Sequence, residues 1–143
     1  MITEQQIDEM ISLMETEDFE DSFVSEQQEF WHYISSDAFS GLSKSEHQLL
    51  FFVISVIFHT CQRSGHPLVF DIDTFQDKEE KNWASREAKD SWTAALDDFF
   101  QGHGQEDLLA FAEDMLVLDD DEQISDIGKE IIFITAKSYI DLI

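Results

Sequence analysis

The feature that most constrains the fold is an apolar segment at residues 49–58, which a single serine, Ser55, interrupts. Ser43 and Glu46 precede it with the spacing of a capping box, a pattern that marks the first turn of a helix. A segment of this length is too short to cross the hydrocarbon core of a membrane. We therefore predict a helix over residues 44–63 that is apolar nearly all round, and neighbouring elements must cover such a helix on several sides.

The rest of the chain also shows helical spacing. Thr3 and Gln6 form a second capping box, and apolar residues follow at i, i+3, i+4 and i+7. We predict further helices over residues 17–36, 73–101 and 124–142, and one whose apolar positions run from 108 to 118; the 73–101 helix has an expected break near Asn82. Residues 68–72 read as an extended connector or one short strand, and strand is a minor alternative for the β-branched stretch at 130–136. Together these helices predict an all-α fold. It is a single-domain bundle of five or six helices that spans residues 1–143 around the central helix at 44–63.

Charge excludes several classes of function. The chain holds 32 Asp and Glu against 8 Lys and Arg, a formal net charge of −24. Direct nucleic-acid binding needs cationic groups that displace counterions from phosphates, so we expect none. An anionic membrane surface would repel the chain for the same reason. The N-terminus lacks the basic and apolar regions of a signal peptide, and a lone Cys61 fits a reducing compartment, so we expect a cytoplasmic protein.

A helical projection of residues 17–36 separates an apolar face from an acidic face. Phe19, Phe23, Phe30, Trp31 and Ile34 fall in one arc. The opposite side carries the acidic residues that we take as candidate partner-binding positions, namely Asp18, Asp21, Glu26 and Glu29. Carboxylates three or four residues apart on a helix can meet the basic surface of another protein.

Candidate metal and catalytic residues are few. Glu29 and His32 have the spacing of a ligand pair on one helix face, as in helical carboxylate bundles. The projection places both on the water side, so a metal-binding protein or enzyme centred on them is the alternative hypothesis. His59, Cys61 and His66 match no zinc pattern, and we interpret Cys61 as a buried small hydrophobe. The acidic turn at 119–122 fails the calcium-loop register because Ile124 stands where glycine belongs.

We find no phosphate-binding loop and no hydrolase motif, and we expect no catalytic residues and no cofactor. Three explanations of the charge remain: solubility alone, halophilic adaptation, or an acidic module that docks on a basic partner. Nuclease inhibitors, immunity-type proteins and nucleic-acid mimics use carboxylates in the last way. Our interpretation is a non-enzymatic protein–protein interaction module whose partner presents a basic surface, with the oligomeric state left open.

Overall fold

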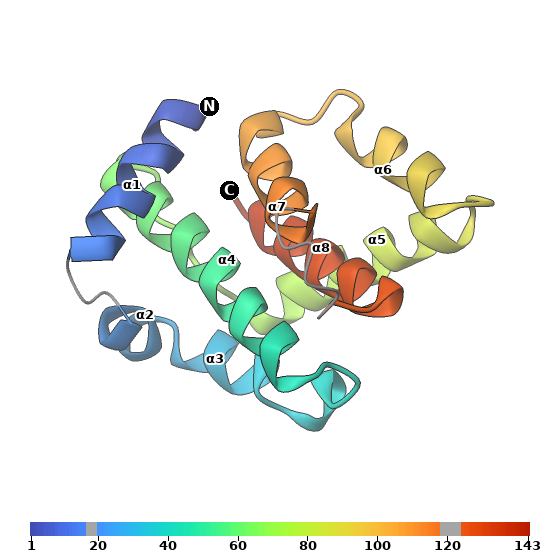
Figure 1. Ribbon diagram of the computed structural model, residues 1–143, viewed down its shortest axis with the longest axis horizontal. Coiled ribbons are helices and arrows are strands. Elements are labelled where there is room, and N and C mark those ends of the chain that lie inside the picture. Colours follow the sequence, from blue (N-terminus) through green and yellow to red (C-terminus); the bar gives the residue numbers. More distant parts are fainter. Residues whose placement is uncertain (17–19, 118–123) are drawn as a thin grey trace.

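The computed structural model describes residues 1–16, 20–117 and 124–143, with the backbone but not the side chains of residues 20–22. These ranges are all-α and contain no strand, which confirms the predicted fold class (Figure 1). In chain order the elements are α1 (Glu4–Thr16), α2 (Glu20–Glu26), α3 (Gln28–Ile34), the 3-10 helix η1 (Asp37–Phe39), α4 (Lys44–Arg63), α5 (Ile72–Glu87), α6 (Trp92–Phe100), α7 (Glu106–Val117) and α8 (Asp126–Ile140).

The described chain has more helices than predicted because two expected long helices are interrupted. The first interruption is at Gln27, between α2 and α3, where the backbone leaves the helical region with φ −123° and ψ 44°. The Gln27 side chain turns inward, is buried, and accepts a hydrogen bond from the Tyr139 hydroxyl at 3.1 Å. The expected single helix over 17–36 is therefore wrong. At that point the buried Gln27 amide bonds to the Tyr139 hydroxyl of α8.

The second interruption separates α5 from α6 at residues 88–91, later than the break expected near Asn82. Asp71 caps α5 by accepting a hydrogen bond from the backbone N–H of Thr74. The Ser91 side chain caps α6, because its hydroxyl accepts from the backbone N–H of Ala94 at 3.1 Å. A capping serine of this kind satisfies a donor that would otherwise lack a partner at the start of a helix.

The other predicted helix starts agree with the structure. Both capping boxes form: Ser43 and Glu46 bond each other's backbone N–H at the start of α4, as do Thr3 and Gln6 before α1. Gly102 has φ +68° directly after the C-cap of α6, in the left-handed region that glycine adopts without strain. Local hydrogen-bonding chemistry therefore sets these boundaries.

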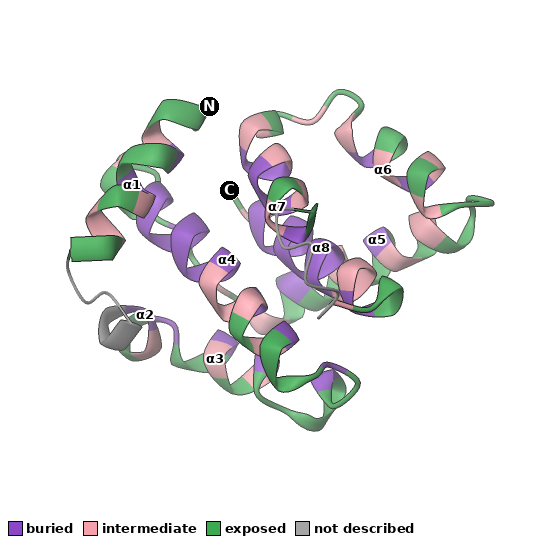
Figure 2. Cartoon of the chain, in the orientation of Figure 1, coloured by how far each residue is buried: buried purple, intermediate pink, exposed green. Residues whose placement is uncertain are grey.

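Two helices, rather than one, form the centre of the core. α4 spans the predicted residues and is buried from Val53 to Cys61. Residues 132–140 of α8 are also all buried, and α8 packs against α4, α5 and α7. Figure 2 shows buried residues concentrated along α4 and α8, with exposed residues on the outer faces of the helices around them. The β-branched stretch of α8 is a fully enclosed helix.

Aromatic side chains fill the space between α3, α5 and α8. The Phe30 ring stacks on those of Phe70 and Tyr139, with centroids 4.7 and 4.5 Å away. Phe75 packs obliquely on the same ring. Aromatic contacts of this kind add to the stabilisation that comes from burial alone. None of the helices in the described ranges combines the length and hydropathy needed to cross a bilayer.

Candidate functional site

Neither Lys nor Arg lies on α1, α2, α3, α6 or α7, so the formal charges of these helices come from carboxylates alone. α1 has four, α6 has two and α7 has four, whereas α5 and α8 mix acidic residues with Lys and Arg. Figure 1 shows α1, α7 and α6 in that order from left to right across the top of the molecule. We call the carboxylates of these helices the acidic surface: Glu4, Asp8, Glu9, Glu15, Asp97, Asp98, Glu106, Asp107, Glu113 and Asp114.

Amphipathic patterning turns these carboxylates outward. On α1, Ile7 and Met10 are buried, while the four acidic side chains are exposed. On α6, Ala95 and Phe99 are buried, and the two aspartates beside them are exposed. Burial of the apolar stripe therefore fixes which way each acidic row faces.

Two hydrogen bonds join α1 to α7 and bring their acidic rows together. The backbone N–H of Ile2 donates to Gln105 Oε1 at 2.9 Å, and that of Glu4 donates to Asp107 Oδ2 at 3.1 Å. The Asp107 carboxylate thus lies at the N-terminus of α1, where the helix dipole favours negative charge. In the structure the acidic neighbour of α1 is α7, because α8 is enclosed.

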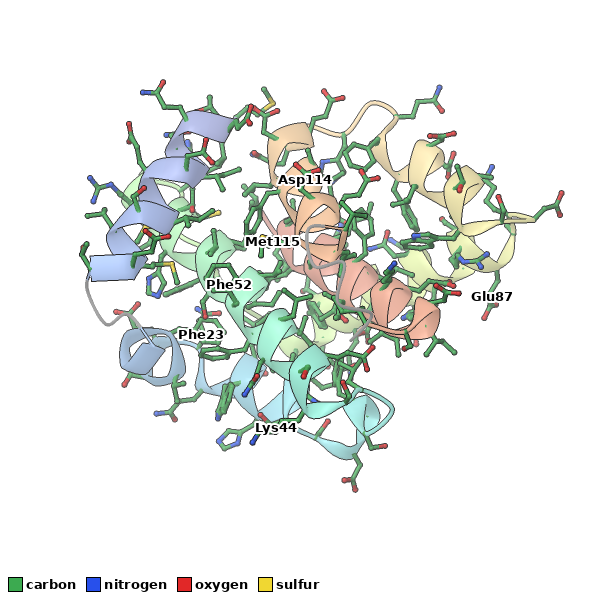
Figure 3. The ribbon with its side chains drawn as sticks, in the orientation of Figure 1. Phe23, Lys44, Phe52, Glu87, Asp114 and Met115 are labelled. Carbon is green, nitrogen blue, oxygen red and sulfur yellow. The ribbon has the colours of Figure 1, made fainter. Side chains whose placement is uncertain are left out.

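Within the acidic surface, the Glu113 carboxylate lies close enough to Asp114 and Asp97 for their charges to repel it. Partial burial raises the pKa of Glu113, and the nearby charges of Asp114 and Asp97 raise it further. Asp97 on α6 and Asp114 on α7 are therefore close enough to disfavour the ionised form of Glu113. Figure 3 shows Asp114 projecting from α7 on the same upper side of the molecule. Folding therefore places like charges together at a cost in stability.

Two open hollows lie within the acidic surface. One, of about 550 Å³, is lined by Asp97, Asp98 and Glu106 with Lys89. Lys89 Nζ is 3.9 Å from Asp98 Oδ1, and both side chains are about two-fifths exposed, so this ion pair neutralises little. The second hollow, of about 670 Å³, follows α1 and is lined by three of its carboxylates and by Arg63. Both hollows present oxygen acceptors to any group that enters them.

The acidic face predicted for residues 17–36 is only partly within the described structure. Asp18 lies outside the described residues, and so does the side chain of Asp21. Glu26 on α2 and Glu29 on α3 are both exposed, and Glu26 Oε2 accepts a hydrogen bond from Gln62 Nε2 at 2.9 Å. The break at Gln27 means that these two glutamates stand on different helices instead of on one continuous face.

The alternative metal-binding pair, Glu29 and His32, lies on α3 with both side chains exposed. Across residues 1–16, 20–117 and 124–143, no three His, Cys, Asp or Glu side chains are placed to hold a metal ion together. The acidic turn at 119–122 falls outside these ranges. Two polar residues that follow this turn have structural roles: Ser125 caps α8, and Glu130 pairs with Arg86.

Cys61 lies fully buried on α4, as the sequence predicted. Burial raises the pKa of its thiol to about 12, so the thiolate that a nucleophile or a zinc ligand requires is strongly disfavoured there. His59 is also buried, whereas His66 is exposed in the loop that follows α4. The three residues therefore occupy different environments.

Sequence reasoning missed a buried polar network between α5, α8 and the loop before α7. Lys137 Nζ donates to Asp141 Oδ2 and to Asn82 Oδ1, both at 2.8 Å, and the Asn82 amide donates to the Ser138 hydroxyl at 3.0 Å. Lys137 also lies over the Phe99 ring, 5.3 Å from its centroid. The available signal was a lysine inside an otherwise apolar helical stretch, since a lysine is rarely buried without partners.

His103 completes this network. Its Nδ1 accepts from the backbone N–H of Gln105 at 2.9 Å, so the ring proton is on Nε2, which donates to Asp141 Oδ1 at 2.7 Å. Burial alone would raise the pKa of Asp141, but hydrogen bonds from Lys137, His103 and Asn82, with the charge of Lys137, outweigh burial and lower it. Every polar group named here has a partner, so the network serves to position the three elements.

Comparisons with known proteins find no match: no protein-family model, no curated protein and no solved structure resembles this chain. The acidic surface is therefore the feature from which a function can be inferred.

Proposed function

We propose that this chain is a non-enzymatic interaction module that docks its acidic surface on a basic protein. The observation that carries the proposal is the segregation of charge over the described helices. α1, α6 and α7 bear carboxylates alone, whereas most of the Lys and Arg residues lie on α4, α5 and α8. A charge that served solubility alone has no reason to be sorted by face, because colloidal repulsion depends on net charge.

The raised pKa of Glu113 supports the same reading. In the free protein the carboxylates of Asp97 and Asp114 repel that of Glu113. Cations from a partner would remove that repulsion, so the clustering that destabilises the free protein would favour binding. Basic surfaces that suit such a site are those that contact nucleic acid. A nuclease inhibitor, an immunity-type protein or a nucleic-acid mimic would act in this way, and we place the interaction in the cytoplasm.

The experiment compares two variants with the same change in net charge. The surface variant carries Asp97→Asn, Glu113→Gln and Asp114→Asn. The control carries Asp73→Asn, Asp77→Asn and Glu80→Gln on α5, where the exposed carboxylates stand beside Lys78 and Lys81. Immobilised wild type and variants are exposed to native lysate at low salt, and retained proteins are identified by mass spectrometry.

The proposal predicts that wild type and control retain the same basic proteins and that the surface variant loses them. Equal loss with both variants would show that total charge attracts the proteins without a specific face. Equal retention by all three would contradict a role for α6 and α7. A further pair of replacements, Glu26→Gln and Glu29→Gln, tests whether the exposed glutamates of α2 and α3 extend the same contact.

A further inference from the structure

A hollow of about 470 Å³ lies between α3 and the first half of α4, away from the acidic surface. Its apolar wall consists of Ile34 and Leu50, which are buried, and of Trp31 and Phe51, which are half-buried. The last two rings meet edge to face, with centroids 5.0 Å apart. The volume falls within the range of about 300–1,000 Å³ that small-molecule sites occupy, and such sites are mostly apolar with a few placed polar groups.

The polar groups of this hollow are cationic or neutral. Lys44 and His47 stand at its edge, and none of the side chains that line it is a carboxylate. That is unusual in a chain with 32 acidic residues, and both large hollows of the acidic surface are lined by carboxylates. Figure 3 shows Lys44 at the end of the molecule where α3 and the start of α4 lie.

Lys44 is available to a ligand. It forms no ion pair with any residue that the structure describes, whereas Arg86, Lys89 and Lys137 each have a carboxylate partner. His47 Nδ1 lies 3.2 Å from the Ser43 carbonyl oxygen, which fixes the proton on Nδ1 and orients the ring at the edge of the hollow. The nearest glutamate in sequence, Glu46, points elsewhere: its carboxylate is buried and bonded to Ser43 and Ser125.

We propose that this hollow binds a small molecule that has one aromatic or aliphatic body and one carboxylate. The apolar body lies against the outer faces of the Trp31 and Phe51 rings within the hollow, and the carboxylate accepts from Lys44 Nζ. A neutral apolar compound would leave Lys44 unpaired, and a cation would be repelled by it. Salt screens the carboxylates that lie more than about 8 Å from the hollow at physiological ionic strength.

The test uses three probes of the same shape and different charge: naphthoate, naphthamide and naphthylmethylammonium. Each is titrated into the whole protein while backbone amide shifts are followed by NMR. We expect saturable shifts centred on Trp31, Lys44 and Phe51 with naphthoate, with a Kd of about 1 mM or tighter for a ligand of this size. Naphthamide should bind up to about fivefold more weakly, the effect of one partly exposed ion pair, and the cation more weakly still.

Two lysine variants decide the role of Lys44. Lys44→Gln should abolish the preference for naphthoate over naphthamide and should fold normally, because Lys44 is exposed. Lys81→Gln makes the same change in net charge on α5, outside the hollow, and should leave the preference intact. The proposal is overturned if naphthoate causes no saturable shifts at these residues, if the three probes bind equally, or if Lys44→Gln keeps the preference.

Discussion

The Glu46 carboxylate on α4 accepts two hydrogen bonds from Ser125, one from its backbone N–H at 2.9 Å and one from its hydroxyl at 3.0 Å. Ser125 is the N-cap of α8, and Glu46 is half of the capping box of α4. One buried carboxylate therefore satisfies donors at the start of both central helices and holds them at a fixed distance. Gly128 makes this approach possible, because a Cβ built there would lie 1.8 Å from Glu46 Oε2.

Gly128→Ala should destabilise the protein by about 1–3 kcal/mol, since the added methyl group displaces the Glu46 carboxylate from Ser125. Helix propensity alone would give the opposite sign, because alanine is favoured over glycine inside a helix by about 1 kcal/mol. Urea unfolding measures the difference. Gly104→Ala is the control, since nothing lies within 4 Å of its built Cβ. A gain in stability at Gly128 would contradict the double cap.

Glu46→Gln tests the same contact through pH. Burial alone would raise the pKa of Glu46, but hydrogen bonds from Ser43 and Ser125 outweigh burial and lower it. A lowered pKa means that the carboxylate stabilises the fold above its unfolded pKa, about 4.3, and that this contribution disappears as pH falls through the folded value. The variant should be less stable by about 1 kcal/mol at pH near 7, and the gap should close in acid. A gap of constant size from neutral to acidic pH would exclude the ionised contact.

Lys137→Met should cost about 3 kcal/mol, because it leaves the Asp141 carboxylate buried without its cation. A second replacement, Asp141→Leu, should recover part of that loss, since a buried pair replaced on both sides is often tolerated. The control is Lys89→Met, which removes an exposed ion pair with Asp98 and should change stability by less than about 1 kcal/mol. Thermal unfolding of wild type, Lys137→Met, Asp141→Leu, the double variant and Lys89→Met gives the comparison. Additive losses in the double variant would show that the two groups act independently.

Glu113→Gln should raise stability by a few tenths of a kcal/mol at neutral pH, because it removes repulsion from Asp114 and Asp97. The sign follows from the raised pKa: the folded state disfavours the ionised glutamate, so its penalty is absent in acid and grows as pH rises through the folded value. If the acidic surface binds a partner, the same variant should weaken that binding. A variant that is more stable and binds as well as wild type would argue that Glu113 has no part in the interface.

The sequence alone allowed a good prediction of helix class and of most helix starts, because caps such as Ser43 and Thr3 act within one turn. It did not reveal the break at Gln27, where the side chain accepts a hydrogen bond from Tyr139, far along the chain. Nor did it predict that Lys137, which interrupts the apolar spacing of α8, would be buried with Asn82 and Asp141 as hydrogen-bond partners. Both features involve contacts between residues that are far apart in the sequence, and the spacing of apolar residues does not reveal such contacts.

The arrangement of the acidic helices at the candidate site could likewise be predicted only in part. Composition established that carboxylates dominate, and amphipathic spacing showed which way each helix turns them. Which rows share a surface depends on the hydrogen bonds of Ile2 and Glu4 to the start of α7 and on the approach of Asp97 to Glu113. The predicted face on residues 17–36 remains a prediction for Asp18 and Asp21, while Glu26 and Glu29 are accessible to a partner.

The most direct test of the central claim is the affinity of wild type and the Asp97→Asn, Glu113→Gln, Asp114→Asn variant for a basic protein retained from lysate, measured from low salt to about 1 M. At about 1 M salt the Debye length falls to about 3 Å, so attraction between exposed charges is largely lost. We predict that wild-type affinity falls steeply with salt and that the variant is weaker and less salt-dependent. An affinity that is independent of salt, or equal for the two proteins, would contradict recognition through the acidic surface.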